Sequence, residues 1–506
     1  MKTYLTSVFF LISLCLSAHG RTDEVSFIQD GFKYIIKTDS TVSISDAGLE
    51  VPLPVSADST LVIPSSVCHE GKTYRVERIE PESFGLRLEI KHLVVSEGVE
   101  RIAQRAFNGC LSLTDISIPS TLDYWDEWAF DFCSNLRRIT VSEQNERYDS
   151  RDDCNAIIKT DENTLVFGCT GTRIPASVET IGFGAFRQCC QHLERIIIPE
   201  GVKRIEPCAF SQCINLKEIS LPVSLESMGY GMFDDCMSLE SVTIPRNVSE
   251  ILGNDWGTHW NLFAGCYNLK EVKVDRQNRT FDSRKNCNAI IDSKTDVLVA
   301  GCGTSFIPEG IKAIGELAFF GSALPAIRIP KSVRKIGSGA FHCCRSLSAI
   351  SVAPGNPVYD SKDDCNAIIE TASARLVQGC SRTRIPGGTK EIADSAFYMV
   401  YYLPPHLVIP EGVEVIGQDA FSDTKLNSVQ LPSTLKRIKR DAFACCKQLY
   451  YVDMSRCSPQ VGFFAFYGCE TLNYVNLPST PGEIDETAFC KTPFEALWKK
   501  EMKQHE

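Results

Sequence analysis

The chain has 506 residues, of which 43% are hydrophobic and 23% charged, values typical of a globular protein rather than a disordered or fibrous one. The 63 Asp and Glu residues outnumber the 52 Lys and Arg residues, and no run of basic residues interrupts the sequence, which argues against binding to a nucleic acid backbone. The 23 cysteines are too few for a small disulfide-stapled scaffold but many for a cytosolic protein of this size.

The N-terminal segment has the pattern of a secretory signal peptide. Lys2 precedes an apolar stretch over residues 4–18, and the small residues that end at Gly20 suit cleavage after that position. We therefore expect residues 1–20 to be removed and the chain to be exported. Lipidation at Cys15 is the alternative, although lipidation signals prefer a small residue where this chain has leucine. No later apolar segment approaches the ~20 residues that a membrane span requires.

Residues 21–63 are predicted to form a β-rich cap. Apolar and polar residues alternate over residues 32–36 and again over residues 41–44, which is the pattern of half-buried strands. A repeat array needs such a cap because its terminal unit would otherwise expose an apolar face. At the other end of the chain, residues 491–506 are predicted to form a helical cap.

Between the two caps one pattern returns fourteen times. It reads Leu-x-x-Ile-x-Ile-Pro, then Val or Leu, then Ile, then Ala-Phe-x-x-Cys, and its phenylalanines are usually 22 to 24 residues apart. Ala precedes the phenylalanine in eleven copies, and Cys follows it by three residues in nine. The repeat phenylalanines are Phe84, Phe107, Phe130, Phe186, Phe210, Phe233, Phe263, Phe319, Phe341, Phe397, Phe421, Phe443, Phe466 and Phe489.

A period near 23 lies in the range of leucine-rich repeats and predicts a β-rich solenoid over residues 64–490. In each strand the last two apolar residues lie two apart and point to one face, while the residues between them face water. Pro ends the strand because it has no N–H to give to a neighbour. We expect Phe to fill the interior, with Ala beside it because neighbouring coils leave little room. The cysteine three residues later should form a buried column rather than a redox centre.

The repeated motif Ile-Pro-x-x-Val-x-x-Ile-Gly-x-x-Ala-Phe-x-x-Cys-x-x-Leu resembles that of the BspA-like leucine-rich repeat proteins of bacterial surfaces, from about residue 60 to about residue 490. The resemblance implies a curved, strand-rich solenoid and a surface adhesin that binds host proteins or other cells. It does not identify a ligand. Because the motif consists of scaffold residues, the resemblance supplies no catalytic positions.

Three intervals of 56 residues between repeat phenylalanines contain the same inserted sequence motif, near residues 142–170, 275–303 and 353–381. Each insert reads Asn-x-x-Tyr or Phe-Asp-Ser, then Cys-Asn-Ala-Ile-Ile, then a polar turn, then Leu-Val-x-Gly-Cys, with small departures. Two short runs rich in β-branched residues around a polar turn predict a β-hairpin.

If the first insert folds about its turn, Ile158 lies opposite Leu165 and Ala156 lies opposite Phe167. The two cysteines of the hairpin then also lie opposite each other. Directly opposed residues of an antiparallel pair have Cα atoms ~4.5–5.5 Å apart, within reach of a disulfide. A disulfide in each hairpin is therefore one interpretation, and buried thiols that pack as small hydrophobes are the other. The candidate pairs are Cys154 and Cys169, Cys287 and Cys302, and Cys365 and Cys380.

Neither a metal site nor a catalytic centre is predicted. The candidate calcium ligands are Asp149, Asp152, Asp153 and Asn155 of the first insert. Several hard oxygens so close together would suit calcium, but the second insert has Lys285 and Asn286 in place of the acidic pair. The eight histidines form no zinc-binding pattern, and no phosphate loop, nucleophile elbow or His-Glu-x-x-His motif occurs. We expect no cofactor and no enzymatic activity.

Aromatic residues that break the repeat composition are the better candidates for a ligand site, because exposed aromatics are common in protein and glycan sites. Trp125 is an exception, since it takes the place of the repeat isoleucine five residues before Phe130 and is expected in the core. The 30-residue interval between Phe233 and Phe263 contains an extra loop with two tryptophans. The candidate ligand patch comprises Trp128, Trp256, Trp260, Tyr401 and Tyr402.

The sequence thus predicts an exported, non-enzymatic leucine-rich repeat protein, secreted or at the cell surface, whose extended face binds a protein of a host or a neighbouring cell. The alternative is a surface protein that binds glycans for nutrient capture through the aromatic loop. A hydrolase grafted on a solenoid is a third class, for which no residue set can be named. Neither a nucleic acid partner nor a transmembrane segment is expected.

Overall fold

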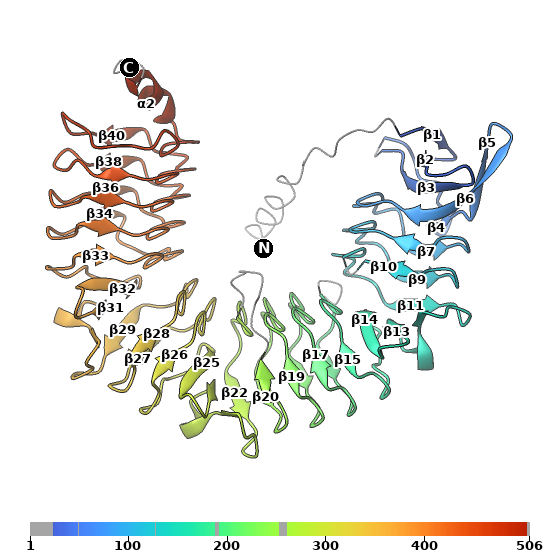
Figure 1. Ribbon diagram of the computed structural model, residues 1–506, viewed down its shortest axis with the longest axis horizontal. Coiled ribbons are helices and arrows are strands. Elements are labelled where there is room, and N and C mark those ends of the chain that lie inside the picture. Colours follow the sequence, from blue (N-terminus) through green and yellow to red (C-terminus); the bar gives the residue numbers. More distant parts are fainter. Residues whose placement is uncertain (1–23, 49, 127, 188–191, 252–260, 503–506) are drawn as a thin grey trace. The chain divides into compact units, whose positions relative to one another are not determined.

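The computed structural model describes residues 24–48, 50–126, 128–187, 192–251 and 261–502, which form short strands joined by turns, with a helix near the C-terminus (Figure 1). Contacts between residues divide the chain into two compact units. The first unit holds residues 1–133 and 141–147, and the second holds residues 134–140 and 148–506. The fold is the predicted β-rich repeat solenoid, and its repeats belong to both units.

The first unit begins with strands in the region where a β-rich cap is expected. Strands β1, β2 and β3 form an antiparallel meander, and β3 pairs in parallel with β6, which also forms a hairpin with β5. The short strands β8 and β10 continue this sheet, while β4, β7 and β9 form a second parallel sheet. The strands are β1 (Ser26–Gln29), β2 (Phe32–Ile36), β3 (Thr41–Asp46), β4 (Thr60–Ile63), β5 (Ser66–His69), β6 (Lys72–Ile79), β7 (His92–Val95), β8 (Arg101–Ile102), β9 (Asp115–Ile118) and β10 (Tyr124–Trp125).

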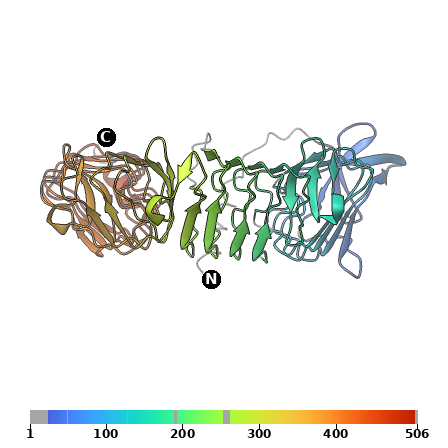
Figure 2. The same cartoon turned by 90° about the horizontal axis from the view of Figure 1, so that it is seen from below.

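In the second unit the repeats form two rows of parallel strands, and Figure 2 shows the first of these rows in the green coils. The first row comes from the Leu-x-x-Ile-x-Ile segment and comprises β16 (Arg195–Ile197), β18 (Glu218–Ser220), β20 (Ser241–Ile244), β22 (Glu271–Val274), β27 (Ala326–Ile329), β29 (Ala349–Val352), β34 (His406–Val408), β36 (Ser428–Gln430), β38 (Tyr451–Asp453) and β40 (Tyr474–Asn476). Strand β11 (Arg138–Val141) comes from the same segment at the boundary of the units.

The second row comes from the isoleucine that precedes the repeat phenylalanine. Its two-residue strands are β15 (Thr180–Ile181), β17 (Arg204–Ile205), β19 (Ser227–Met228), β21 (Glu250–Ile251), β26 (Ala313–Ile314), β28 (Lys335–Ile336), β33 (Glu391–Ile392), β35 (Val415–Ile416), β37 (Arg437–Ile438) and β39 (Gln460–Val461). The strands stay in register from coil to coil, so that Ile181 lies beside Ile205, which lies beside Met228, and all three are buried.

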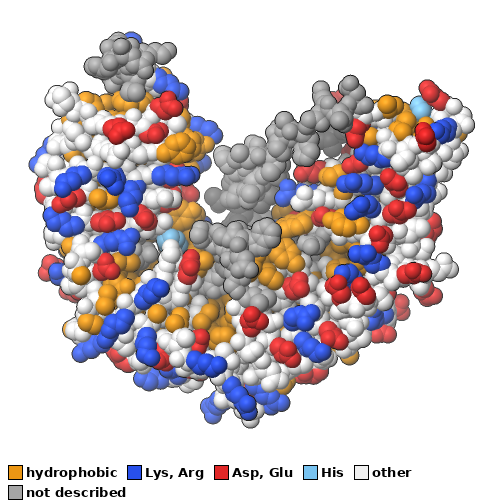
Figure 3. All heavy atoms as spheres, in the orientation of Figure 1, with side chains coloured by type: hydrophobic (Ala, Val, Ile, Leu, Met, Phe, Trp, Pro, Cys, Tyr) orange, Lys and Arg blue, Asp and Glu red, His pale blue; other side chains and the backbone are white. Residues whose placement is uncertain are grey.

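Polar side chains between the apolar positions face solvent, as the period-2 pattern predicts. Many of them pair with the neighbouring coil, as Lys203 does with Glu179 at 2.8 Å. Figure 3 shows charged side chains of both signs interspersed over the surface. Such exposed pairs contribute little stability individually, about 0–1 kcal/mol, so the buried face must hold the coils together.

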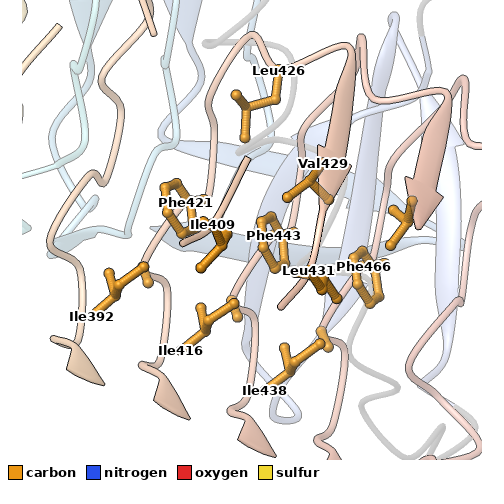
Figure 4. Packing of buried hydrophobic residues seen from close by; sticks show 14 of the residues in the cluster. Ile392, Ile409, Ile416, Phe421, Leu426, Val429, Leu431, Ile438, Phe443 and Phe466 are labelled. Carbon is orange, nitrogen blue, oxygen red and sulfur yellow. The ribbon is translucent and has the colours of Figure 1, made fainter. Parts of the chain in front are cut away.

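The core is a stack of the repeat phenylalanines. Between the inserts, consecutive rings lie 4.9–6.2 Å apart between centroids with interplanar angles of at most 22°. Figure 4 shows Phe421, Phe443 and Phe466 in line, flanked by the isoleucines of the second row. Complete burial of an aromatic ring is among the largest single contributions to folding, and here it recurs with every coil that carries the repeat phenylalanine.

The eight repeat cysteines among the described residues form the predicted buried column, and each has the same hydrogen-bond role. Its Sγ donates a hydrogen bond to the carbonyl oxygen of the phenylalanine of the preceding repeat, over 3.0–3.3 Å. These donors are Cys110, Cys133, Cys213, Cys236, Cys266, Cys344, Cys446 and Cys469. Cysteine suits the position because it is small and apolar yet carries a weak S–H donor.

Each insert is a coil in which a hairpin replaces the usual strand and glycine replaces the phenylalanine. The last strand of the insert pairs in parallel with the next strand of the second row. The glycine that ends this strand lies under the next ring, where a Cβ at Gly168, Gly301 or Gly379 would overlap Phe186, Phe319 or Phe397. The insert strands are β12 (Tyr148–Asp149), β13 (Ala156–Lys159), β14 (Thr164–Gly168), β23 (Phe281–Asp282), β24 (Ala289–Asp292), β25 (Val297–Gly301), β30 (Tyr359–Asp360), β31 (Ala367–Glu370) and β32 (Arg375–Gly379).

The second unit ends at helix α2 (Glu495–Met502), in the place where a helical cap is expected. Phe494 and Trp498 are buried and meet the last ring of the stack, Phe489, edge-on at 5.1 and 5.6 Å. The helix thus covers the apolar end of the solenoid that a further repeat would otherwise cover.

Candidate functional site

The candidate ligand site in the second unit is a cluster of two tyrosines and two cations, here called the tyrosine patch. It comprises Arg345, Tyr401, Tyr402 and Lys425. The Arg345 guanidinium lies 5.0 Å from the centre of the Tyr401 ring, and Lys425 Nζ lies 5.4 Å from the same ring. Lys425 Nζ also lies 5.8 Å from the Tyr402 ring, whose residue is 70% exposed.

The repeat itself brings these residues together. Arg345, Tyr401 and Lys425 each stand four residues after a repeat phenylalanine, in coils that follow one another around the third insert. The same row continues with Lys447, which pairs with Glu470 at 3.0 Å. The two tyrosines stand out in the sequence because they depart from the repeat composition, whereas the two cations do not. Aligning the repeats on their phenylalanines would have placed all three residues in one row.

The segment that carries the tyrosines is fixed on both sides. Before them, the Tyr398 ring meets the His342 ring at 5.8 Å, and Met399 Sδ accepts a hydrogen bond from Cys343 Sγ at 3.3 Å. After them, Leu403 is buried and two prolines follow. A binding surface held in this way loses little conformational entropy when a ligand binds.

Burial also shapes the titration of two groups next to the patch. Burial raises the pKa of Tyr398 to about 12, so this hydroxyl stays protonated at neutral pH. Burial likewise raises the pKa of Asp423, and the positive charges of Lys447 and Arg345 offset part of that effect.

The other aromatic residues considered in the sequence do not belong to the tyrosine patch or lie outside the described residues. Trp256 and Trp260 lie outside the described residues. Trp128 belongs to the first unit, where its backbone N–H donates to Asp126 Oδ1 at 3.0 Å, and it is not part of the tyrosine patch. Trp125 is buried and stacks on Phe130 at 5.0 Å, which confirms its predicted place in the core.

The predicted opposition of the insert cysteines is wrong. Ile158 does face Leu165, but the register shifts between Ile157 and Ile158, so that Ala156 faces Gly168 rather than Phe167. This β-bulge moves the two cysteines out of direct opposition. The other two hairpins shift at the equivalent position.

All six cysteines of the candidate pairs are free thiols in the structure: Cys154, Cys169, Cys287, Cys302, Cys365 and Cys380. In each hairpin the second thiol donates to a backbone carbonyl of the opposite strand segment, as Cys169 Sγ does to Asn155 O at 3.3 Å. Burial raises the pKa of the first thiol in each hairpin. The sulfurs therefore act as buried hydrogen-bond donors, like the repeat cysteines.

Two of the candidate calcium ligands, Asp149 and Asn155, make structural contacts, and the other two lie exposed in a turn. The Asp149 carboxylate binds the Arg151 guanidinium, with Arg151 Nε 2.8 Å from Asp149 Oδ1. Asp152 and Asp153 lie in the short 3-10 turn that follows, both with positive φ. Among the described residues, no three His, Cys, Asp or Glu side chains converge as metal ligands would.

The predicted signal peptide, residues 1–20, lies outside the described residues. Within the part of the chain that the structure describes, no helix is long and apolar enough to cross a membrane.

Comparisons with known proteins identify the repeat. A family profile described as the BspA type leucine rich repeat region matches six times, over residues 72–154, 168–290, 302–362 and 378–496. The gaps between these matches coincide with the hairpins of the three inserts. No curated protein matches the chain.

Three solved structures are similar over most of their length. A leucine rich cell surface protein of Faecalibacterium prausnitzii is 20% identical with a TM-score of 0.38, over 90% of this chain and 95% of that one. A leucine-rich repeat protein of Bacteroides ovatus is 23% identical with a TM-score of 0.35, over 90% and 94%. The pneumococcal vaccine antigen PcpA is 17% identical with a TM-score of 0.36, over 93% and 88%. From the repeated match to the family profile, the chain belongs to the BspA-type leucine-rich repeat family.

Proposed function

We propose that the protein is exported to the cell surface or secreted, and that it acts without catalysis as an adhesin or scaffold that binds another protein through the tyrosine patch. The export step rests on the signal peptide pattern of residues 1–20. The repeat family supplies an extended scaffold, and in such folds the function resides in sites on the surface rather than in the fold itself.

The composition of the tyrosine patch favours a protein as the ligand. Tyr and Arg are enriched at the energetic centres of protein interfaces, because a ring and a guanidinium combine a large apolar area with a polar end. Tyr402 is 70% exposed although Leu403 beside it is buried, so its ring projects from an anchored segment. The proposed ligand surface is acidic or carries hydrogen-bond acceptors, to match Arg345 and Lys425.

The test is an array of extracellular proteins and glycans probed with the purified chain from residue 21 onward. The informative variant is Tyr401→Ala with Tyr402→Ala, which removes both rings but leaves the scaffold residues in place. The matched control is Tyr474→Ala, because Tyr474 is also exposed, at 66%. It lies on β40, the last strand of the sheet β34-β36-β38-β40, whereas the two tyrosines of the patch precede the first strand, β34. We expect a protein ligand whose binding falls at least about tenfold in the double variant and is unchanged in the control.

Binding to glycans alone would instead favour the role in nutrient capture. Equal binding of a protein ligand by the wild type and the double variant would place the interface elsewhere on the solenoid and overturn the assignment to the tyrosine patch.

A further inference from the structure

The three inserts share one backbone, which makes their surfaces directly comparable. In each, a buried aromatic residue and an aspartate form a two-residue strand, followed by a serine and a 3-10 turn: Arg151–Asp153, Arg284–Asn286 and Lys362–Asp364. The middle residue of the turn has a φ of 59°, 58° and 53° in the three inserts. The inserts therefore differ at exposed positions in their side chains and not in their backbone conformation.

The second insert differs from the other two in charge. Over the equivalent residues 141–155, 274–288 and 352–366, the first insert has five acidic and two basic residues, the second two acidic and four basic, and the third three acidic and one basic. The changes fall on exposed turn positions. Arg276 and Arg279 stand where the first insert has Glu143 and Glu146, and Lys285 and Asn286 stand where it has Asp152 and Asp153.

Two of these basic residues, Arg276 and Lys285, line a hollow. A cavity of about 810 Å³ lies between strand β22 and the second insert, with Lys273, Arg276, Arg284 and Lys285 on its walls. Figure 3 shows basic side chains gathered at the tip of the segment that follows β22, at the bottom of the view. A volume of this size lies in the range of small-molecule sites, about 300–1,000 Å³, and would admit a short oligomer.

Two of the four cations are bound within the protein. Arg284 bridges Asp282 at 2.6 Å and Asp296 at 2.9 Å, and the hydrogen bond with Asp282 raises its pKa further. Lys273 pairs with Glu271 at 2.7 Å. The third acid on the wall, Asp275, accepts the Gln277 backbone N–H at 2.8 Å.

Arg276 and Lys285 are the cations that remain for a ligand. Both side chains are exposed, and neither forms an ion pair within the described part of the chain. In the first insert the same two positions are acidic, so the scaffold does not require a positive charge at either of them. Two unpaired cations on the rim of one hollow favour an anionic ligand.

The rest of the lining indicates the class of anion. Val272 and Phe281 are buried and Val274 is half-buried, so the hollow offers no fully exposed aromatic or large aliphatic side chain as an anchor for a protein. Its walls instead carry amides and hydroxyls, including Thr243, Asn286 and Asn288, which suit the hydroxyls of a sugar. We propose that the hollow beside the second insert binds an acidic oligosaccharide, with Arg276 and Lys285 contacting its carboxylate or sulfate groups.

This site is separate from the tyrosine patch in the residues that form it, so each can be tested without the other. The test measures binding to the purified chain by isothermal titration calorimetry with four probes: an oligogalacturonate for carboxylate, a heparin hexasaccharide for sulfate, a neutral cello-oligosaccharide, and a short poly-glutamate peptide. The variant is Arg276→Glu with Lys285→Asp, which restores the side chains of the first insert. Asp152 holds the same backbone conformation as Lys285, so the variant is expected to fold.

The matched control is Lys331→Glu with Lys335→Asp, which changes the net charge equally at two exposed lysines of the same unit that do not line the hollow. We expect one of the two acidic oligosaccharides to bind, more weakly at higher salt, and the Arg276 and Lys285 variant to bind it at least about tenfold less tightly than the control. The stronger of the two ligands identifies the anion.

Three results would overturn the proposal: no binding of either acidic sugar, equal binding by the variant and the control, or binding of poly-glutamate alone, which would indicate an acidic protein. Because the tyrosine patch is unchanged in this variant, loss of the sugar with retained protein binding separates this site from the proposed function.

Discussion

The thiol of Cys110 donates a hydrogen bond to the carbonyl oxygen of Phe84 over 3.1 Å, and both residues are completely buried. Within the described residues, this thiol is the one donor that the Phe84 carbonyl has. In the next coil the Phe107 carbonyl has two donors, since it accepts from Cys133 Sγ at 3.2 Å and from the Cys110 backbone N–H at 3.3 Å. At Phe84 the thiol thus satisfies a carbonyl that has no backbone donor in the described part of the chain, whereas at Phe107 it adds a second donor.

Replacing Cys110 by valine should destabilise the first unit more than the same change at Cys133. The variant Cys110→Val leaves a buried carbonyl without a donor, which costs about 1–3 kcal/mol. In Cys133→Val the Phe107 carbonyl keeps a backbone donor, so the cost should be smaller although the change in volume is the same. Denaturant unfolding of the two variants checks the difference. Equal losses would mean that packing and not the hydrogen bond sets the role of the cysteine.

The parts of the fold that repeat were predictable, because a fixed sequence period becomes a fixed position in space. The spacing of Phe421, Phe443 and Phe466 places the three rings in one stack, and a cysteine at a constant distance from each ring forms one column. Position in the repeat also identified Trp125 as a core residue in place of isoleucine.

Features that depend on local backbone geometry were not predictable. The predicted pairing of the first hairpin assumed that each residue faces one residue of the opposite strand. The bulge between Ile157 and Ile158 makes that assumption wrong. The hairpin of β5 and β6 had no counterpart in the prediction, because β5 does not belong to the repeat pattern. Composition marked Tyr401 and Tyr402, but only contacts between coils show that Arg345 and Lys425 surround them.

Position 379 requires glycine because the Phe397 ring lies against it, and not because of its backbone conformation. A Cβ there would overlap the Phe397 ring, which is itself completely buried, so Gly379→Ala must displace the first ring of the stack. Overpacking of this kind costs typically about 1–3 kcal/mol. The matched control is Gly387→Ala in the same unit, where a Cβ would meet no described atom within 4 Å. Thermal unfolding should show a loss of stability for the first variant only, and equal behaviour would contradict the proposed stacking of insert and ring.

The insert cysteines should be found as free thiols in protein purified without reductant. Peptide mapping after alkylation in denaturant should give six single peptides and no linked pair from Cys154 and Cys169, Cys287 and Cys302, or Cys365 and Cys380. In the folded protein the same thiols should alkylate slowly, because burial raises the pKa of residues such as Cys154 and lowers the thiolate fraction. Three linked pairs would restore the disulfide interpretation and show that the hairpins can close despite their bulges.

The ionised form of Asp423 should destabilise the folded protein at neutral pH. Burial raises the pKa of its carboxyl above the ordinary value of 3.8, so the folded state holds the proton more tightly than the unfolded state does. The contribution of Asp423 to stability is therefore largest below about pH 4 and is lost as the pH rises through the raised pKa. Replacement by asparagine, which accepts the positive φ of 58° at this position, should stabilise the protein at pH 7 and have less effect at pH 4.

The control for this prediction is Asp296→Asn, at a residue with the same φ of 58°. Hydrogen bonds from Lys312 and Arg284 lower the pKa of Asp296, so its ionised form contributes stability that is present above the ordinary pKa and lost as the pH falls. Asp296→Asn should therefore destabilise the second unit at pH 7, opposite in sign to Asp423→Asn. Urea unfolding of both variants at pH 4 and pH 7 measures the two signs. A loss of stability at pH 7 in Asp423→Asn would show that Lys447 and Arg345 compensate the charge of Asp423 fully, because the ionised carboxylate would then be stabilising.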